Sequence, residues 1–169
     1  EGLAFDIKHG LDAWTTYLKG RHAQLRLRQG RLQEAETLAR GALAEEGQTV
    51  LMQVPALTVL ATVRSRLGAG DASELLDAVL EHALAMREQQ RLTPVRLAYI
   101  EHFYLRGKPE EARAHLEAMV NFGTGVLRPW DAGALRVWAR RLDVPLPEDV
   151  GARPTDAQAL ELAGDHEAA

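Results

Sequence analysis

Gly30-Arg-Leu-Gln-Glu34-Ala35 is the stretch that decides the fold, because its pattern recurs along the chain. An alanine again stands five residues after a glycine in Gly107-Lys-Pro-Glu-Glu111-Ala112 and in Gly164-Asp-His-Glu-Ala-Ala169, and a degenerate copy begins near Gly68. Each glycine follows an apolar, helix-like run. A turn glycine followed by a small residue is typical of stacked helical hairpins, in which the small residue lies where two helices cross closely.

The composition also favours helices. The 169 residues include 27 alanines and 26 leucines but only two isoleucines, a balance that favours helix over sheet. The net charge is −4 without a long run of one sign, which argues against nucleic acid or an anionic membrane as a partner. The absence of cysteine excludes disulfides and thiolate chemistry, and it is compatible with the cytoplasmic location that we expect. No stretch approaches 18 uninterrupted apolar residues, so we expect no membrane span.

The periodicity of apolar residues predicts three helix pairs, followed by less regular elements. We expect an irregular hairpin at about 123–154, which includes a helix over 130–142, and a last helix over 155–163. The expected pairs are 11–28 with 33–46, 55–67 with 73–88, and 91–106 with 109–121.

Four details of these helices can be tested. We expect Leu11, Trp14, Leu18 and Leu25 to form the apolar core stripe of the first helix. Pro55 and Pro94 are expected in the first turns of their helices, with Thr93 as an N-cap. His22 falls on the same apolar stripe and is expected to be partly buried. Ala35 and Ala112 are expected to be buried at helix crossings.

The best copy of the pattern resembles a tetratricopeptide (TPR) repeat: Tyr99-Ile-Glu-His-Phe103-Tyr-Leu-Arg-Gly107-Lys-Pro-Glu-Glu-Ala112. It has the large–small–aromatic–glycine–alanine order of that family, except that Ile100 takes the small position. The resemblance implies an all-α fold over residues 1–169, a single domain in which about four antiparallel hairpins form a right-handed superhelical stack, or α-solenoid.

The order of elements resembles the C-terminal helical-repeat region of bacterial signal-transducing ATPases, the LuxR-type or MalT-like regulators. Four stretches carry this resemblance: Leu11-Asp-Ala-Trp14 with Tyr17, Pro55 to Arg64, Arg91-Leu-Thr-Pro-Val95, and Ala159 to Asp165. It implies a ligand-sensing or protein-interaction segment of a longer transcriptional regulator. The chain lacks the Gly-x-x-x-x-Gly-Lys-Ser/Thr phosphate loop, so ATP hydrolysis is not assigned to it.

No catalytic constellation is predicted. Ser65 and Ser73 are the only serines, and neither stands in a Gly-x-Ser-x-Gly elbow. The six histidines are scattered without metal-ligand spacing. We therefore expect no enzyme activity, no metal and no cofactor.

The candidate binding residues share one face of the first helix. Tyr17, Arg21, Gln24 and Arg28 are spaced by 4, 3 and 4 residues, and in a stack of hairpins the first helix of each pair lines the concave surface. Two arginines in one row favour an acidic peptide or another anionic ligand. A solvated outer stripe is the alternative interpretation. The row is extended on the next hairpin by three residues: Thr58, Thr62 and Arg66.

The expected partner is therefore a protein, a peptide or a small-molecule inducer on the concave face, without nucleic acid or membrane. A free-standing TPR adaptor or scaffold without an ATPase module is the alternative function, and an enzyme on a helical scaffold is a third.

Overall fold

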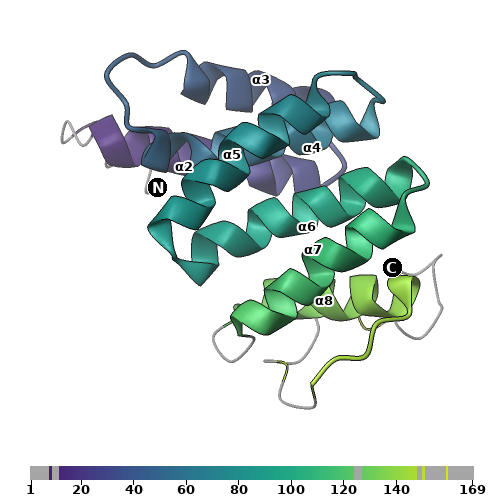
Figure 1. The fold of residues 1–169 in the computed structure, drawn as a ribbon. Helices are drawn as coiled ribbons and strands as arrows, with labels where there is room; N and C mark the ends of the chain where they lie inside the picture. The colour runs from purple at the N-terminus through teal and green to yellow at the C-terminus, as the bar shows by residue number, and fades with distance from the viewer. Residues whose placement is uncertain (1–7, 9–11, 124–126, 148–149, 151–158, 160–169) are drawn as a thin grey trace. The chain divides into compact units, whose positions relative to one another are not determined.

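The computed structural model describes residues 8, 12–123, 127–147, 150 and 159. The described residues form helices, turns and loops without any strand, which confirms the all-α prediction (Figure 1). The expected turn at Gly164 and all of the last predicted helix except Ala159 lie outside the described residues. The chain divides into two compact units, residues 1–87 and 88–169.

Within residues 12–87, four helices pack around one apolar core. Their bounds are α2 (Asp12–Arg28), α3 (Leu32–Leu43), α4 (Val50–Arg66) and α5 (Ala72–Met86). Helix α4 contacts each of the other three, and α2 also contacts α3. The core is built largely from alanine and valine, which allows the helices to approach closely; it consists of Ala23, Leu27, Ala35, Ala39, Ala42, Ala56, Val59, Leu60 and Val63.

In the described part of the second unit, between residues 88 and 147, three helices are in mutual contact. Their bounds are α6 (Gln89–Leu105), α7 (Pro109–Phe122) and α8 (Pro129–Leu142). The expected pairs α2–α3, α4–α5 and α6–α7 are thus all in contact. Larger side chains fill this core: Ile100, Ala112, Leu116, Met119, Leu135, Trp138, Ala139, Leu142 and Val150.

The predicted turn glycines close three helices in the same way. Gly30, Gly68 and Gly107 have φ angles of +74°, +70° and +68°, the left-handed region that glycine adopts most easily. Each glycine N–H donates to the carbonyl three residues earlier, and the next residue's N–H donates to the carbonyl five residues earlier, at 2.9–3.1 Å. This is the Schellman motif, which satisfies carbonyls at a helix end.

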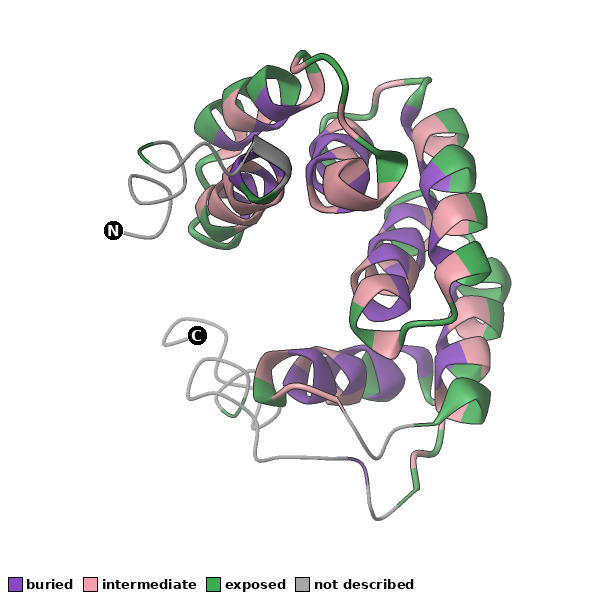
Figure 2. Ribbon diagram, turned by 90° about the vertical axis from the view of Figure 1, so that its left-hand side faces the viewer, coloured by how far each residue is buried: buried purple, intermediate pink, exposed green. Residues whose placement is uncertain are grey.

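The helices that follow these turns bury matching stripes, which begin with a small residue. Ala35 and Ala112 are fully buried, as predicted, and each is followed by buried residues four and seven positions later. In α5 the same place is taken by Ala72, four residues after Gly68 instead of five. The degenerate copy therefore differs by one residue in its turn and keeps the buried stripe. Figure 2 colours the buried, intermediate and exposed positions along the helices.

The expected positions of two prolines are wrong. Pro55 and Pro94 lie inside α4 and α6, because these helices begin at Val50 and Gln89. Thr93 is consequently a buried residue within α6, not its N-cap. A proline inside a helix removes one backbone hydrogen bond and is costly. Burial of the apolar residues before each proline offsets that cost and extends the helix backwards; Val54 and Leu92 are both 3% exposed.

The expected core face of the first helix is also wrong. Trp14 and Leu25 are 54% and 51% exposed, and Leu18 is only half-buried, whereas Leu11 lies outside the described residues. The buried stripe of α2 instead consists of small residues and one leucine: Thr16, Gly20, Ala23 and Leu27. Small residues form the buried face of α2 because they let α4 come very close to the α2 backbone.

Candidate functional site

Helix α2 carries two stripes on opposite sides. The buried stripe follows positions 16, 20, 23 and 27, and an open stripe follows positions 14, 18, 21, 25 and 28. Both repeat at spacings of four and three residues, which is the spacing of a helix surface that packs along another helix. They are offset by two residues, or about 200° around the helix. The open stripe therefore points away from the core of the first unit.

The open stripe combines large apolar residues with arginines. Trp14 and Leu25 are exposed and Leu18 is half-buried between them. The ring of Tyr17 meets that of Trp14 edge to face, with centroids 6.0 Å apart. Single exposed apolar residues are ordinary on a protein surface, but two exposed ones with the half-buried Leu18 between them form a potential contact surface. We refer to Trp14, Leu18, Arg21, Leu25 and Arg28 as the α2 open stripe.

The predicted row of polar residues lies on and beside this stripe. Tyr17, Arg21 and Gln24 are half-buried, and Arg28 is exposed. Tyr17, Arg21 and Arg28 already make interactions within the chain, so they are not simply solvated side chains. The predicted binding row stays a prediction, whereas the apolar residues beside it, Trp14 and Leu25, are exposed and were wrongly expected in the core.

The predicted extension of the row onto α4 does not form an open surface. Thr58 and Thr62 are each 5% exposed. Their hydroxyls donate to the carbonyls of Val54 and Thr58 at 2.7 and 2.8 Å, one helical turn earlier. Arg66 alone of this group is exposed, at the end of α4. Helix α4 buries threonines on this face because it contacts three other helices of the unit.

Residues of α2 can be compared with the residues at equivalent positions of α4, which contact a neighbouring helix. Helices α2 and α4 have 17 residues each and end two residues before Gly30 and Gly68. When the two helices are aligned on these glycines, Tyr17 and Leu18 of α2 correspond to Pro55 and Ala56 of α4. On α4 these two residues pack against Gly20 of α2, where an added Cβ would lie 3.0 Å from the Pro55 Cβ. Tyr17 and Leu18 thus occupy the positions through which α4 contacts its own neighbour.

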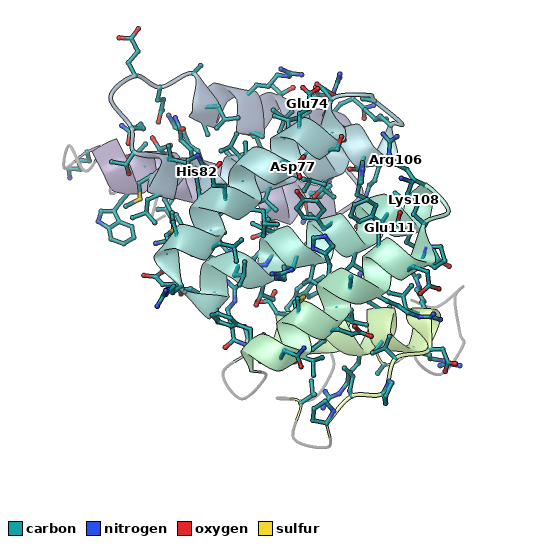
Figure 3. The ribbon with its side chains drawn as sticks, in the orientation of Figure 1. Glu74, Asp77, His82, Arg106, Lys108 and Glu111 are labelled. Atoms are coloured by element: carbon teal, nitrogen blue, oxygen red, sulfur yellow. The ribbon has the colours of Figure 1, made fainter. Side chains whose placement is uncertain are left out.

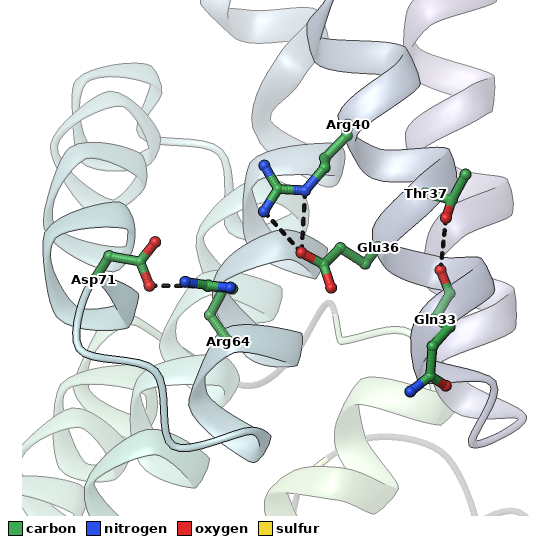
Figure 4. A network of polar contacts seen from close by, with 6 residues as sticks. All are labelled: Gln33, Glu36, Thr37, Arg40, Arg64 and Asp71. Atoms are coloured by element: carbon green, nitrogen blue, oxygen red, sulfur yellow. Dashed lines mark hydrogen bonds and ion pairs between the residues drawn. The ribbon is translucent and has the colours of Figure 1, made fainter.

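The clearest polar network of the first unit is structural. Arg40 donates from Nε and Nη2 to one carboxylate oxygen of Glu36, at 3.0 and 2.7 Å (Figure 4). Arg64, in the last turn of α4, donates to Asp71 just before α5 at 2.9 Å. That hydrogen bond lowers the pKa of Asp71 and raises that of Arg64. The Arg64–Asp71 contact ties the α4–α5 turn together, and the Arg40–Glu36 pair lies within α3.

Other titratable side chains are found along α5 and at the start of α7. Along α5, Glu74, Asp77 and His82 are spread over two turns of the helix, three and five residues apart (Figure 3). In the second unit Lys108 pairs with Glu111 at 3.7 Å within the first turn of α7. Within the described ranges, no group of three histidine, aspartate or glutamate side chains could hold a metal ion.

No protein family, characterised protein or solved structure matches the chain. In the part of the chain that the structure describes, no helix has the length and apolarity needed to cross a membrane.

Proposed function

We propose that this chain is a non-catalytic helical-repeat domain that binds a protein partner through the α2 open stripe. The observation that carries the proposal is the exposure of Trp14 and Leu25 on a stripe whose spacing matches the buried stripe on the other side of α2. Recurring turn glycines and matching buried stripes support a TPR-like stack of hairpins, an architecture that serves mainly for recognition.

The partner that fits this surface is a helix with a small residue at the crossing point. Pro55 and Ala56 of α4 are accommodated by Gly20 of α2, and Tyr17 and Leu18 correspond to them in the repeat. A partner helix with glycine or alanine at that crossing would repeat the same contact. Arg21 and Arg28 on the stripe favour acidic residues beside it.

The apolar part of the stripe is large enough to supply useful affinity. A tryptophan buries on the order of 150–250 Å² when fully covered. Trp14 is 54% exposed, so a partner would remove on the order of 100 Å² of this side chain from water. At about 25 cal/mol per Å² this corresponds to roughly 2–3 kcal/mol, or about 30- to 150-fold in affinity.

The resemblance to the helical-repeat region of bacterial ATPase regulators places this proposal in a biological setting. In that setting the chain is a ligand-sensing or protein-interaction segment in the cytoplasm, and partner binding alters the arrangement of neighbouring modules. A free-standing adaptor would use the same surface without those modules. The sequence of the complete gene distinguishes the two, through a phosphate loop upstream and a helix-turn-helix downstream.

Site-specific photo-crosslinking in the cells that naturally express the chain tests the proposed function. A benzophenone amino acid at position 14 or 25 should give the same discrete protein adduct, with the crosslink mapping to a helical segment. Position 84 on α5 is the control, because Leu84 is also a large apolar residue that is 45% exposed. Absence of an adduct at 14 and 25, or identical adducts at 84, would refute the assignment.

Substitution then measures the contribution of the stripe to binding of the identified partner. Leu25→Asp should weaken binding at least about tenfold, while Leu84→Asp should leave it unchanged. Replacing Arg21 and Arg28 together by alanine should weaken binding of an acidic partner and leave the far-UV circular dichroism spectrum intact, because the buried stripe of α2 is unchanged.

A separate experiment tests the non-catalytic part of the proposal. The chain should show no saturable ATP binding, no ATP hydrolysis and no binding to duplex DNA at physiological salt. Saturable nucleotide binding, or a DNA complex whose affinity falls steeply with salt, would contradict it.

A further inference from the structure

The α6–α7 hairpin holds a cluster of aromatic and basic side chains outside the α2 open stripe. The ring of His115 on α7 stacks on Tyr99 of α6, with centroids 4.3 Å apart and an interplanar angle of 11°. Phe103 lies one turn further along α6, and its ring centroid is 5.6 Å from that of His115. Tyr99 is buried, so the ring stack has a fixed orientation.

Arg96 completes this cluster one turn before Tyr99. Its side chain is half-buried, and its Nη1 atom lies 3.4 Å from Nδ1 of His115, a long contact for a hydrogen bond. The Nε atom is inaccessible to solvent and has no hydrogen-bond partner in the structure. The edge of the guanidinium formed by Nε and Nη2 therefore has no acceptor among the described residues.

Other arginines of the same hairpin are paired. Arg91 donates to Glu88 at 2.7 Å, and Arg113 donates to Glu110 at 3.0 Å. Arg96 makes no such ion pair with any carboxylate of the described residues. Its unmatched charge is thus particular to this position and is not a general property of the helix surface.

The environment of Arg96 disfavours an isolated cation. Burial lowers the pKa of Arg96, and Tyr99 only partly opposes this. The guanidinium nevertheless stays protonated, as arginine does in proteins. A buried donor without an acceptor destabilises the fold, and a charged one does so more strongly. An anion that accepts from the guanidinium would relieve both the unmatched charge and the missing hydrogen bond.

We propose that the Arg96–His115 cluster binds a carboxylate. A carboxylate that displaces the side chains covering Nε would accept two parallel N–H bonds from the Nε–Nη2 edge, which match its two oxygens. The surrounding rings of Tyr99 and Phe103 also favour a singly charged, planar group over a phosphate dianion, whose removal from water is more costly. A peptide C-terminus, an acidic side chain of a partner and a small carboxylic acid all supply this chemistry.

Nuclear magnetic resonance of the arginine Nε–H groups tests the proposal on the full chain. The probes are sodium acetate and sodium phosphate, with sodium chloride at matched ionic strength as the reference. Arg96→Lys assigns the Arg96 signal, and Arg140→Lys is the control, because Arg140 is exposed on α8. We expect the chemical shift of the Arg96 signal to change saturably with acetate. Chloride should cause no saturable change.

The variants then identify the binding group. The saturable acetate response at neighbouring backbone amides should weaken at least tenfold in Arg96→Lys and in Arg96→Met, and it should be unchanged in Arg140→Lys. A response to acetate that does not saturate overturns the proposal, and this result requires no variant. Survival of saturable binding in both Arg96 variants overturns it, and so does saturable binding of phosphate alone.

Discussion

Replacing Gly20 by alanine tests how closely α2 and α4 cross. A Cβ at this position would lie 2.9 Å from the backbone nitrogen of Ala56 and 3.0 Å from Cβ of Pro55. The nearer atom belongs to the backbone, so no side-chain rotation relieves the contact and α4 itself must move. Overpacking of this kind typically costs about 1–3 kcal/mol.

The intrinsic helix preference of alanine acts in the opposite direction. Alanine inside a helix is favoured over glycine by roughly 0.5–1 kcal/mol. Gly41 provides the matched control, because it lies inside α3, is exposed, and an added Cβ there would meet nothing within 4 Å. Gly41→Ala should therefore be stabilising. Gly20→Ala should have the same gain in helix preference, reduced by the cost of overpacking the α2–α4 crossing. The difference between the two variants, about 1–3 kcal/mol, isolates that penalty.

Urea unfolding followed by far-UV circular dichroism measures this difference. Gly20→Ala should have a lower midpoint than Gly41→Ala at a similar m value, because the surface exposed on unfolding is almost the same. Equal midpoints for the two variants would show that α2 and α4 are not in close contact at Gly20. That result would also remove the basis for relating the α2 open stripe to the α2–α4 contact.

Three further outcomes follow from the same structure. Ala112→Leu should overpack the α6–α7 crossing and lower stability by roughly 1–3 kcal/mol, and an unchanged melting temperature would show that the register of α7 is wrong. Gly107→Ala should cost about 1–2 kcal/mol through its φ of +68° alone, which urea midpoints would detect, because an added Cβ would meet nothing within 4 Å. Burial raises the pKa of Glu45, but hydrogen bonds from Lys19 and Thr16 outweigh it and hold the pKa below its ordinary value of 4.5. Because the folded-state pKa is the lower one, this contribution to stability is present above about pH 4.5 and is lost as the pH falls through the folded-state value, so Glu45→Gln should unfold with a weaker dependence on acid in this range.

The features that the sequence predicted well depend on short-range rules. A glycine between two periodic runs predicts a left-handed turn residue, and Gly30, Gly68 and Gly107 all have positive φ. Ala35 and Ala112 were predicted to be buried because a small residue at a fixed distance from the turn faces the preceding helix, and both are fully buried. These rules involve residues that are close together in the sequence.

The incorrect predictions concern the buried face of α2 and the start of α4, which depend on contacts with helices that are distant in the sequence. In α2 both Trp14–Leu18–Leu25 and the stripe through Gly20 have the spacing of a packed face, and size alone favoured the first. The second stripe is the buried one, because the backbone of α4 lies so close to position 20 that only glycine fits there. The start of α4 was misjudged for a similar reason, because burial in the unit extends the helix before Pro55.

The Arg96 cluster could not be predicted from the sequence. An arginine on a helix is usually solvated or paired with a carboxylate one turn away, as Arg91 is with Glu88. The distinct state of Arg96 depends on burial and on His115, which is 19 residues away on α7. A single sequence does not indicate which of its 17 arginines will meet such an environment.

The two stripes of α2 explain why the helix combines unusually small and unusually large residues. A close crossing with α4 requires glycine and alanine on one side, which contribute little apolar area for burial. Large residues on the opposite side add nothing to the stability of an isolated unit while they stay exposed to water. Trp14 and Leu25 therefore contribute little to the core of the first unit, although their stripe has the same spacing as the buried stripe of α2. Their placement is explained if another helix covers them, because α2 would then have a neighbour on each side.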